Sequence, residues 1–361
     1  MRPAAANAHT SASAPSRCGI DPGEMRALVH SLGAPLEFLR GASLLFTGAT
    51  GWFGVWLLDL LCAADDSLGL GLRITVVSRD PGAFLRRFPA FGGDSRIVWV
   101  TADIRNLALA GEGFSHVIHA ATDSSERSRR SSPRELFESI VDGTRRAIDA
   151  AGSQCRSFLL LSSGAVYGPA RAGHDRFAEV MPGGPDPALA TSAYAEGKRA
   201  AETACAIAAG EGLPVRIARC FAFVGPHMPF DQHFAIGNFI ADAVAGRQIS
   251  VRSDGAPLRS YLYMTDLVRA LLLVMGVGTV GRPYNVGSDD VVSIAELARR
   301  VDRIAGGAGV HIGGARSDPG DRYIPDLTRL HSELGFRPEV TLDDVIARTV
   351  AWLRGRSRAG I

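Results

Sequence analysis

A glycine-rich turn near the start of the chain joins a short apolar segment to a helical one. Gly48, Gly51 and Gly54 follow the apolar residues 44–47 and open a stretch with helical spacing. In a strand–turn–helix unit, the first glycine allows a tight turn and the second lets backbone N–H groups approach a pyrophosphate. The third lets the helix pack closely on the strand. The spacing therefore predicts a dinucleotide-binding turn at residues 48–54.

From Ser43 onward, short apolar runs alternate with helical patterns. Uninterrupted apolar strands of this kind suit a parallel sheet that is covered on both faces. We therefore expect an α/β fold, namely a Rossmann-type doubly wound parallel sheet with a smaller C-terminal substrate-binding lobe. The expected strands begin at Leu44, Ile74, Ile97, His116, Phe158 and Val215.

Proline- and glycine-containing loops become frequent after Phe223, and this change suggests where the domains meet. We predict a tail and an N-terminal helix over residues 1–40 and a dinucleotide-binding domain over residues 41–225. Residues 226–361 are predicted to form mainly the substrate-binding lobe, with some segments returning to the sheet.

The end of the second expected strand bears on the choice of cofactor. A carboxylate usually stands there to hold the ribose hydroxyls of NAD, but this chain has Ser78 and Arg79, followed by Asp80. An arginine at this point can pair with the 2′-phosphate of NADP, so NADP is slightly favoured over NAD. Two alternatives stay open, because Asp80 can turn inward and favour NAD, and Arg79 can be a solvated strand end.

Composition narrows the class of protein. The net charge is only +2 and 46% of the residues are hydrophobic, which disfavours both disorder and a nucleic-acid partner. The five cysteines are widely spaced without a C-x-x-C pair, and no His/Cys/Asp cluster has metal-ligand spacing, so we expect reduced thiols and no metal. No apolar stretch approaches the roughly 20 residues that span a bilayer. A cytoplasmic protein without a membrane partner is expected.

Three side chains have the chemistry of proton transfer from a hydroxyl. Tyr194 and Lys198 are four residues apart on a predicted helix, so the phenol and the ammonium share a face. A free phenol has a pKa near 10, and a nearby cation stabilises its phenolate. Ser163 ends the strand that begins at Phe158, at the sheet edge where open α/β folds bind ligands. Together they predict a base, a cation and a polarising hydroxyl in one site.

These elements together carry a family resemblance. The chain has T-G-A-T-G-W-F-G at the glycine turn, H-A-A after the fourth strand, Ser163 four residues before Tyr167, and Y-x-x-x-K. From Leu44 to Trp352 it resembles the extended short-chain dehydrogenases/reductases of the NAD-dependent epimerase/dehydratase family, which modify nucleotide-linked sugars. The resemblance implies that NAD(P) binds at Gly48, Thr50, Gly51, Trp52, Phe53, Gly54, Ser78, Arg79, Asp103, Ile104, Ala120, Ala121, Tyr194 and Lys198.

Some of these assignments, and those for the substrate, leave alternatives open. Trp52 and Phe53 are also candidates for helix–sheet packing, and Ser124 is as well explained by loop capping. The resemblance implies that two arginines hold the substrate diphosphate, which an arginine fork suits. The candidate substrate-binding residues are Ser124, Gly164, Asn238, Arg259 and Arg322.

Two departures from the family pattern affect the predicted reaction. The family's sugar 4,6-dehydratases carry an Asp-Glu pair after the catalytic hydroxyl residue, where this chain has Gly164 and Ala165, so standard dehydration is disfavoured. Ala222 stands where many nucleotide-sugar enzymes have an asparagine that contacts the diphosphate.

We therefore predict an NAD(P)-dependent nucleotide-sugar epimerase that acts through a transient keto sugar. The alternatives are an NADPH-dependent keto-sugar reductase, a dehydratase with a non-standard acid/base pair, and a non-catalytic dinucleotide sensor. The resemblance also implies a homodimer that pairs helices around residues 137–150 and 194–209.

Overall fold

The computed structural model describes residues 16–109, 113–122, 132–170, 173–230, 234–318 and 320–358. Its central feature is a seven-stranded, fully parallel sheet with the strand order β11-β6-β5-β4-β1-β2-β3. The predicted doubly wound α/β fold is confirmed. The strands are β1 Ser43–Thr47, β2 Arg73–Ser78, β3 Ile97–Thr101, β4 His116–His119, β5 Ser157–Ser163, β6 Val215–Cys220 and β11 Pro283–Val286.

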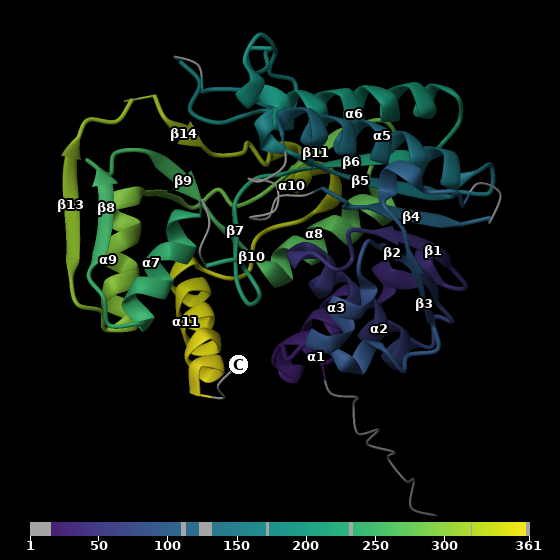
Figure 1. Cartoon of the computed structure of the whole chain (residues 1–361), viewed down its shortest axis with the longest axis horizontal. Helices are drawn as coiled ribbons and strands as arrows, with labels where there is room; N and C mark the ends of the chain where they lie inside the picture. The colour runs from purple at the N-terminus through teal and green to yellow at the C-terminus, as the bar shows by residue number, and fades with distance from the viewer. Residues whose placement is uncertain are drawn as a thin grey trace, which may run out of the picture.

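Helices cover both faces of this sheet because its strands are apolar on both sides. Within β1, Leu44 and Phe46 pack into one core with α2 and α8, whereas Leu45 packs into the other core with α5 and α6. Figure 1 shows α5 and α6 along one face of the sheet and α2, α3 and α8 along the other. These helices are α2 Trp52–Leu68, α3 Pro81–Arg87, α5 Pro133–Ala151, α6 Ala193–Gly210 and α8 Met264–Val277.

The order of the strands creates the crevice in which a ligand can bind. The chain runs outward from β1 to β2 and β3, and then returns to place β4 on the other side of β1. Loops leaving the carboxyl ends of β1 and β4 therefore diverge, and in open α/β sheets ligands bind at this switch point.

A smaller lobe lies beside the carboxyl ends of the strands (Figure 1). It contains the strand pairs β7–β10 and β8–β13 and the three-stranded sheet β12-β9-β14. The chain re-enters the main fold through α8 and β11; the predicted domain boundaries stay a prediction. The elements of the lobe are β7 Phe223–Val224, α7 Ala235–Val244, β8 Ile249–Ser253, β9 Leu258–Ser260, β10 Leu262–Tyr263, β12 Val291–Ser293, α9 Ile294–Ala305, β13 Val310–Ala315, β14 Arg322–Tyr323 and α11 Leu342–Arg358. Helix α10 Thr328–Leu334 packs on β11 and α8 of the main fold.

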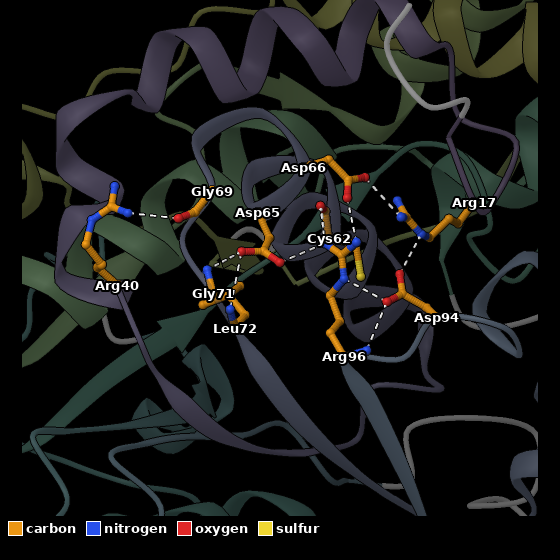
Figure 2. Close-up of polar contacts among 10 residues, drawn as sticks. All are labelled: Arg17, Arg40, Cys62, Asp65, Asp66, Gly69, Gly71, Leu72, Asp94 and Arg96. Carbon is orange, nitrogen blue, oxygen red and sulfur yellow. Dashed lines mark hydrogen bonds and ion pairs between the residues drawn. The ribbon is translucent and has the colours of Figure 1, made fainter. Parts of the chain in front are cut away.

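The N-terminal helix α1 Pro22–Leu32 packs on α2 and α8. Its cap is Asp21, whose side chain accepts a hydrogen bond from the backbone N–H of Glu24 at 3.1 Å. The segment before it is held by ion pairs that are shown in Figure 2, where Arg17 bridges Asp66 at 3.0 Å and Asp94 at 3.1 Å. This network fixes the start of the described chain against the end of α2 and the start of β3.

Short 3-10 turns complete the connections between these elements. They are η1 Ala34–Leu39, η2 Pro89–Phe91, η3 Ile104–Asn106, η4 Gly164–Tyr167 and η5 Ala190–Ser192. Within the described ranges, no helix is both long and apolar enough to cross a membrane.

Candidate active site

The glycine turn between β1 and α2 is built so that no side chain fits at two of its positions. Gly48 has φ +79°, and a Cβ there would lie 2.4 Å from the carbonyl carbon of Ala120. A Cβ at Gly54 would lie 2.2 Å from the carbonyl oxygen of Gly48. Helix α2 is capped by Gly51, which supplies no side chain, so the N-terminal N–H groups of the helix are left for an anion.

A cleft of about 450 Å³ extends from this turn along the carboxyl ends of the strands. Most of the residues predicted to bind the cofactor lie on its wall. Arg87 and His227 also line it, and sequence reasoning did not select them for the cofactor site. The predicted residues on the wall are Gly48, Thr50, Gly51, Trp52, Ser78, Arg79, Asp103, Ile104, Ala120 and Ala121.

Arg79 lies with two carboxylates, those of Asp80 and Asp103, at the end of the cleft beside β2. The carboxylate of Asp80 caps α3 by accepting a hydrogen bond from the N–H of Ala83 at 2.8 Å. Asp103 forms an ion pair with Arg105 at 2.8 Å, and this contact, together with the charge of Arg79, lowers the pKa of the Asp103 carboxyl. Both carboxylates therefore already have partners within the protein.

A second cleft of about 770 Å³ adjoins the first and shares Gly48, Gly51 and Trp52 with it. It contains the four remaining predicted cofactor residues, Phe53, Gly54, Tyr194 and Lys198. Ser163 also lines it. The three predicted catalytic side chains, which come from β5 and α6, are therefore brought together beside the glycine turn.

Lys198 is held rigidly in this second cleft. Its side chain is 4% exposed, and the ammonium donates to Thr122 Oγ1 and to the carbonyl oxygen of Leu161, both at 2.7 Å. Burial lowers the pKa of Lys198 to about 8. Burial also raises the pKa of the half-buried Tyr194, and the nearby Ser163 hydroxyl partly offsets this rise.

Sequence reasoning missed one hydroxyl at the site. Tyr323 lines the second cleft, and its hydroxyl lies against Gly164, the residue that follows Ser163. The preceding residue, Arg322, was selected instead, but its side chain forms an ion pair with Asp175. Neighbouring residues of a strand point to opposite sides, so Tyr323 faces the cleft while Arg322 faces away from it.

The other predicted substrate residues are not all gathered in the second cleft. Arg259 lines it and forms an ion pair with Asp321 at 2.9 Å. Asn238 lies on α7, and neither it nor Arg322 is among the residues that line the cleft. Gly164 lies behind the wall, where a Cβ would be 2.6 Å from the hydroxyl oxygen of Tyr323. Ser124 lies outside the described residues.

A sequence model described as the NAD dependent epimerase/dehydratase family matches residues 44–287. The chain belongs to the NAD-dependent epimerase/dehydratase family. The predicted resemblance is therefore confirmed, and the chain is an enzyme of the extended short-chain dehydrogenase/reductase type.

Several characterised family members are similar over most of the chain. UDP-glucuronic acid decarboxylase 1 of Xenopus tropicalis is 28% identical over 329 residues, which cover 89% of this chain and 75% of the relative. A dTDP-glucose 4,6-dehydratase of Streptomyces griseus is 32% identical over 244 residues, which cover 66% of this chain and 72% of the relative.

Solved structures agree with the family assignment. DesIV, a dTDP-glucose 4,6-dehydratase of Streptomyces venezuelae solved with NAD, superposes with a TM-score of 0.73 at 26% identity, covering 88% of this chain and 98% of that one. UDP-glucose 4-epimerase of Thermotoga maritima also has a TM-score of 0.73, covering 87% and 99%, but at 20% identity it shows the shared fold alone.

Few charged side chains line the second cleft. Ala165 and Ala222 line it at two of the positions where the sequence departs from the family pattern. Among the described residues that line this cleft, Lys198 and Arg259 carry charge and none is Asp, Glu or His. No group of three or more His, Cys, Asp and Glu residues in the described ranges could hold a metal ion.

Proposed function

We propose that the protein is a nucleotide-sugar epimerase that removes a hydride and a proton from one carbinol of the sugar and returns the hydride to the other face of the resulting ketone. One observation carries the proposal: the cleft brings Ser163, Tyr194 and Lys198 together, while its described lining offers no carboxylate for elimination. Transient oxidation of a carbinol needs the serine hydroxyl, the phenol and the ammonium group, and it needs no carboxylate.

The residues of the two clefts fit a dinucleotide cofactor. A bound nicotinamide dinucleotide would accept the hydride and later return it. Its pyrophosphate would lie on the N–H groups of α2, which the glycines leave open, and its adenosine would lie beside Arg79 and Asp103. We propose NADP rather than NAD, because Asp80 is engaged in capping α3 and Arg79 lines the cleft.

The proton of the sugar hydroxyl would pass to the phenolate of Tyr194. Burial works against this phenolate, since it raises the pKa of Tyr194, so a cation is needed nearby. Lys198 supplies it, because with a pKa of about 8 it is mostly protonated at neutral pH. Ser163 would donate a hydrogen bond to the sugar oxygen and polarise it. Arg259, at the lobe side of the cleft, would hold the diphosphate.

The packing around Gly164 argues against the standard dehydratase. A Cβ there would also lie 2.9 Å from the ring of Phe221, so an acidic side chain at this position would displace both Phe221 and Tyr323. Elimination of water would have to use other groups.

Decarboxylation of a nucleotide-linked sugar acid is a second candidate. Its support is the cationic lining, in which Lys198 and Arg259 suit an additional carboxylate, together with the likeness to UDP-glucuronic acid decarboxylases. A ketone formed beside a carboxylate-bearing carbon makes a β-keto acid, which loses carbon dioxide without a further catalytic acid.

We also propose a cytoplasmic homodimer. Its interface would involve α5 and α6, which lie side by side and expose Phe137 and Ile207 at 37% and 60%. The buried free cysteines suit a reducing compartment.

A panel of UDP- and dTDP-linked sugars and sugar acids, incubated with the wild type and with Tyr194→Phe, tests the proposed function. We expect the wild type to give an isomeric product with its cofactor retained, and the variant to bind cofactor without turnover. Stoichiometric consumption of NADPH would indicate a reductase instead. A variant with undiminished turnover would remove Tyr194 from the mechanism, and a wild type that binds cofactor but converts nothing would favour a sensor.

A further inference from the structure

An arginine and a histidine from distant parts of the chain meet at the wall of the first cleft. Arg87 is the last residue of α3, and His227 follows Pro226 in the loop after β7; both line the cleft. Nη2 of Arg87 lies 3.3 Å from Nδ1 of His227, and the guanidinium lies over the ring of Phe88, 4.9 Å from its centroid. No carboxylate within the described ranges forms an ion pair with Arg87, so its charge is left for a ligand of the cleft.

The two hydrogen bonds of His227 decide which of its ring nitrogens carries the proton. Nε2 lies 2.9 Å from the backbone carbonyl oxygen of Cys18, which can only accept, so Nε2 bears the hydrogen. Nδ1 then has a free lone pair and accepts a hydrogen bond from the guanidinium of Arg87. Burial and the charge of Arg87 lower the pKa of His227 to about 4, so the ring is neutral at pH 7. His227 therefore orients the arginine without neutralising its charge.

His227 is held in place by both ends of the described chain. Its ring packs edge-on against Phe88 and against Trp352 of α11, with ring centroids 5.2 Å and 4.9 Å away. The segment that supplies the Cys18 carbonyl is itself fixed, because the Cys18 thiol donates to the carboxylate of Asp59 at 3.0 Å. Among the described residues other than glycine, His227 alone has a positive φ, of +67°. Surrounding contacts on this scale are what keeps an unfavourable backbone conformation in place, so the ring is rigid enough to aim a neighbour.

The pair lies beside the N-terminus of α2. The carbonyl oxygen of Pro226, the residue before His227, accepts hydrogen bonds from the indole N–H groups of Trp52 at 3.0 Å and Trp56 at 3.1 Å. Trp52 is the first residue of α2 and follows Gly51, which supplies no capping side chain. The two indoles therefore bring His227, and the guanidinium bonded to it, to the part of the cleft where the N–H groups of the helix face an anion.

We propose that Arg87 binds the pyrophosphate of the dinucleotide cofactor and that His227 is the positioning residue that aims its guanidinium. This inference rests on the proposed binding of a nicotinamide dinucleotide in the first cleft. A guanidinium suits the role because it is a planar fork of N–H donors, so it can donate to phosphoryl oxygens while one N–H stays on His227. The pyrophosphate is common to NAD and NADP. Arg87 should therefore contribute equally to the affinity for both, unlike a residue that contacts the 2′-phosphate.

Calorimetric titration of NAD and of NADP into the cofactor-stripped wild type, Arg87→Met and Arg86→Met tests the role of Arg87. Arg86 precedes Arg87 on α3 and is not among the residues that line the cleft, so its variant controls for the general loss of one positive charge. We expect Arg87→Met to weaken both dinucleotides about tenfold or more, the effect of losing a hydrogen bond to a charged group, and Arg86→Met to stay within about twofold of the wild type. Equal affinities of the two variants would overturn the inference, and so would a loss in Arg87→Met that is confined to NADP.

A double-mutant cycle tests the positioning role of His227. Asparagine tolerates a positive φ, but its side chain is too short to contact both the Cys18 carbonyl and Arg87, so His227→Asn releases the guanidinium. We expect this variant to weaken both dinucleotides about threefold when Arg87 is present and to have no further effect in the Arg87→Met background. The same loss in both backgrounds would refute the positioning role, since a merely structural effect does not depend on Arg87. A wild type that binds neither dinucleotide would instead remove the proposed function on which the inference rests.

Discussion

The buried ammonium of Lys198 should make stability depend on pH in a defined window. Burial lowers its pKa from 10.5 to about 8 in the folded protein. Between these values the unfolded chain binds more protons than the folded one, so the free energy of unfolding rises as the pH rises through the window. Below about pH 8 both states are charged, and the folded state bears the whole cost of the buried charge.

The size of this effect follows from the same values. The difference between 10.5 and about 8 corresponds to about 3 kcal/mol, at about 1.4 kcal/mol per pH unit. Lys198→Met removes the charge and keeps a chain of similar shape. It also leaves the Leu161 carbonyl and the Thr122 hydroxyl without the ammonium donor, which costs about 1–3 kcal/mol for each buried group. Because these contributions oppose one another at pH 7, the pH dependence is the diagnostic quantity.

The pH dependence of the free energy of unfolding is measured by urea denaturation of the cofactor-stripped wild type and of Lys198→Met, from pH 7 to pH 10. Other titrating groups are common to both proteins and cancel in the difference. We expect the wild type to gain about 2 kcal/mol relative to the variant between pH 8 and pH 10, while the variant loses turnover by about a hundredfold or more. A difference that stays constant with pH would refute the reasoning that Lys198 is a destabilised, charged group at neutral pH.

Three further substitutions test the cofactor turn, the choice of cofactor and the support beneath the site. Gly48→Ala should lower the free energy of unfolding by about 3 kcal/mol, because it combines a positive φ with a Cβ that overlaps Ala120. Thermal denaturation measures this loss, and a loss below about 1 kcal/mol would contradict the prediction. Arg79→Glu should weaken NADP binding by about a hundredfold and leave the affinity for NAD unchanged, as measured by calorimetry. Equal losses of affinity for NADP and NAD would show that Arg79 does not contact the 2′-phosphate. Arg219→Met should lower the free energy of unfolding in urea by about 2–3 kcal/mol, since it leaves the partly buried carboxylate of Glu202 without the guanidinium now 2.7 Å away. Stability equal to the wild type would mean that the pair contributes nothing.

Local geometry made the glycine turn and the catalytic helix predictable from sequence. The constraints on Gly48 and Gly54 come from backbone within the same turn or from the adjacent strand end, and the spacing of Tyr194 and Lys198 is set by one helical turn. The fold was predictable for a similar reason, because each parallel strand is a short apolar run between helical patterns. The predicted roles of these residues await the experiments above.

The lobe was less predictable because its residues reach the site through long-range pairing. Tyr323 belongs to a two-residue strand, and nothing in its immediate sequence indicates that pairing with β9 will place it in the lining of the second cleft. Arg322 shares that strand but pairs with Asp175. Similarly, Asp80 is adjacent to Arg79 in sequence, and only the structure shows that the Asp80 carboxylate caps α3.

The central claim is that the sugar is oxidised and reduced at the same carbon with the hydride kept inside the protein. Conversion of an active nucleotide sugar in deuterium oxide, with mass spectrometry of the product, tests this most directly. The account predicts an isomeric product without carbon-bound deuterium and without added cofactor, because the hydride that leaves is the one that returns. A product that has lost carbon dioxide or water and gained one carbon-bound deuterium would contradict it and establish decarboxylation or dehydration instead.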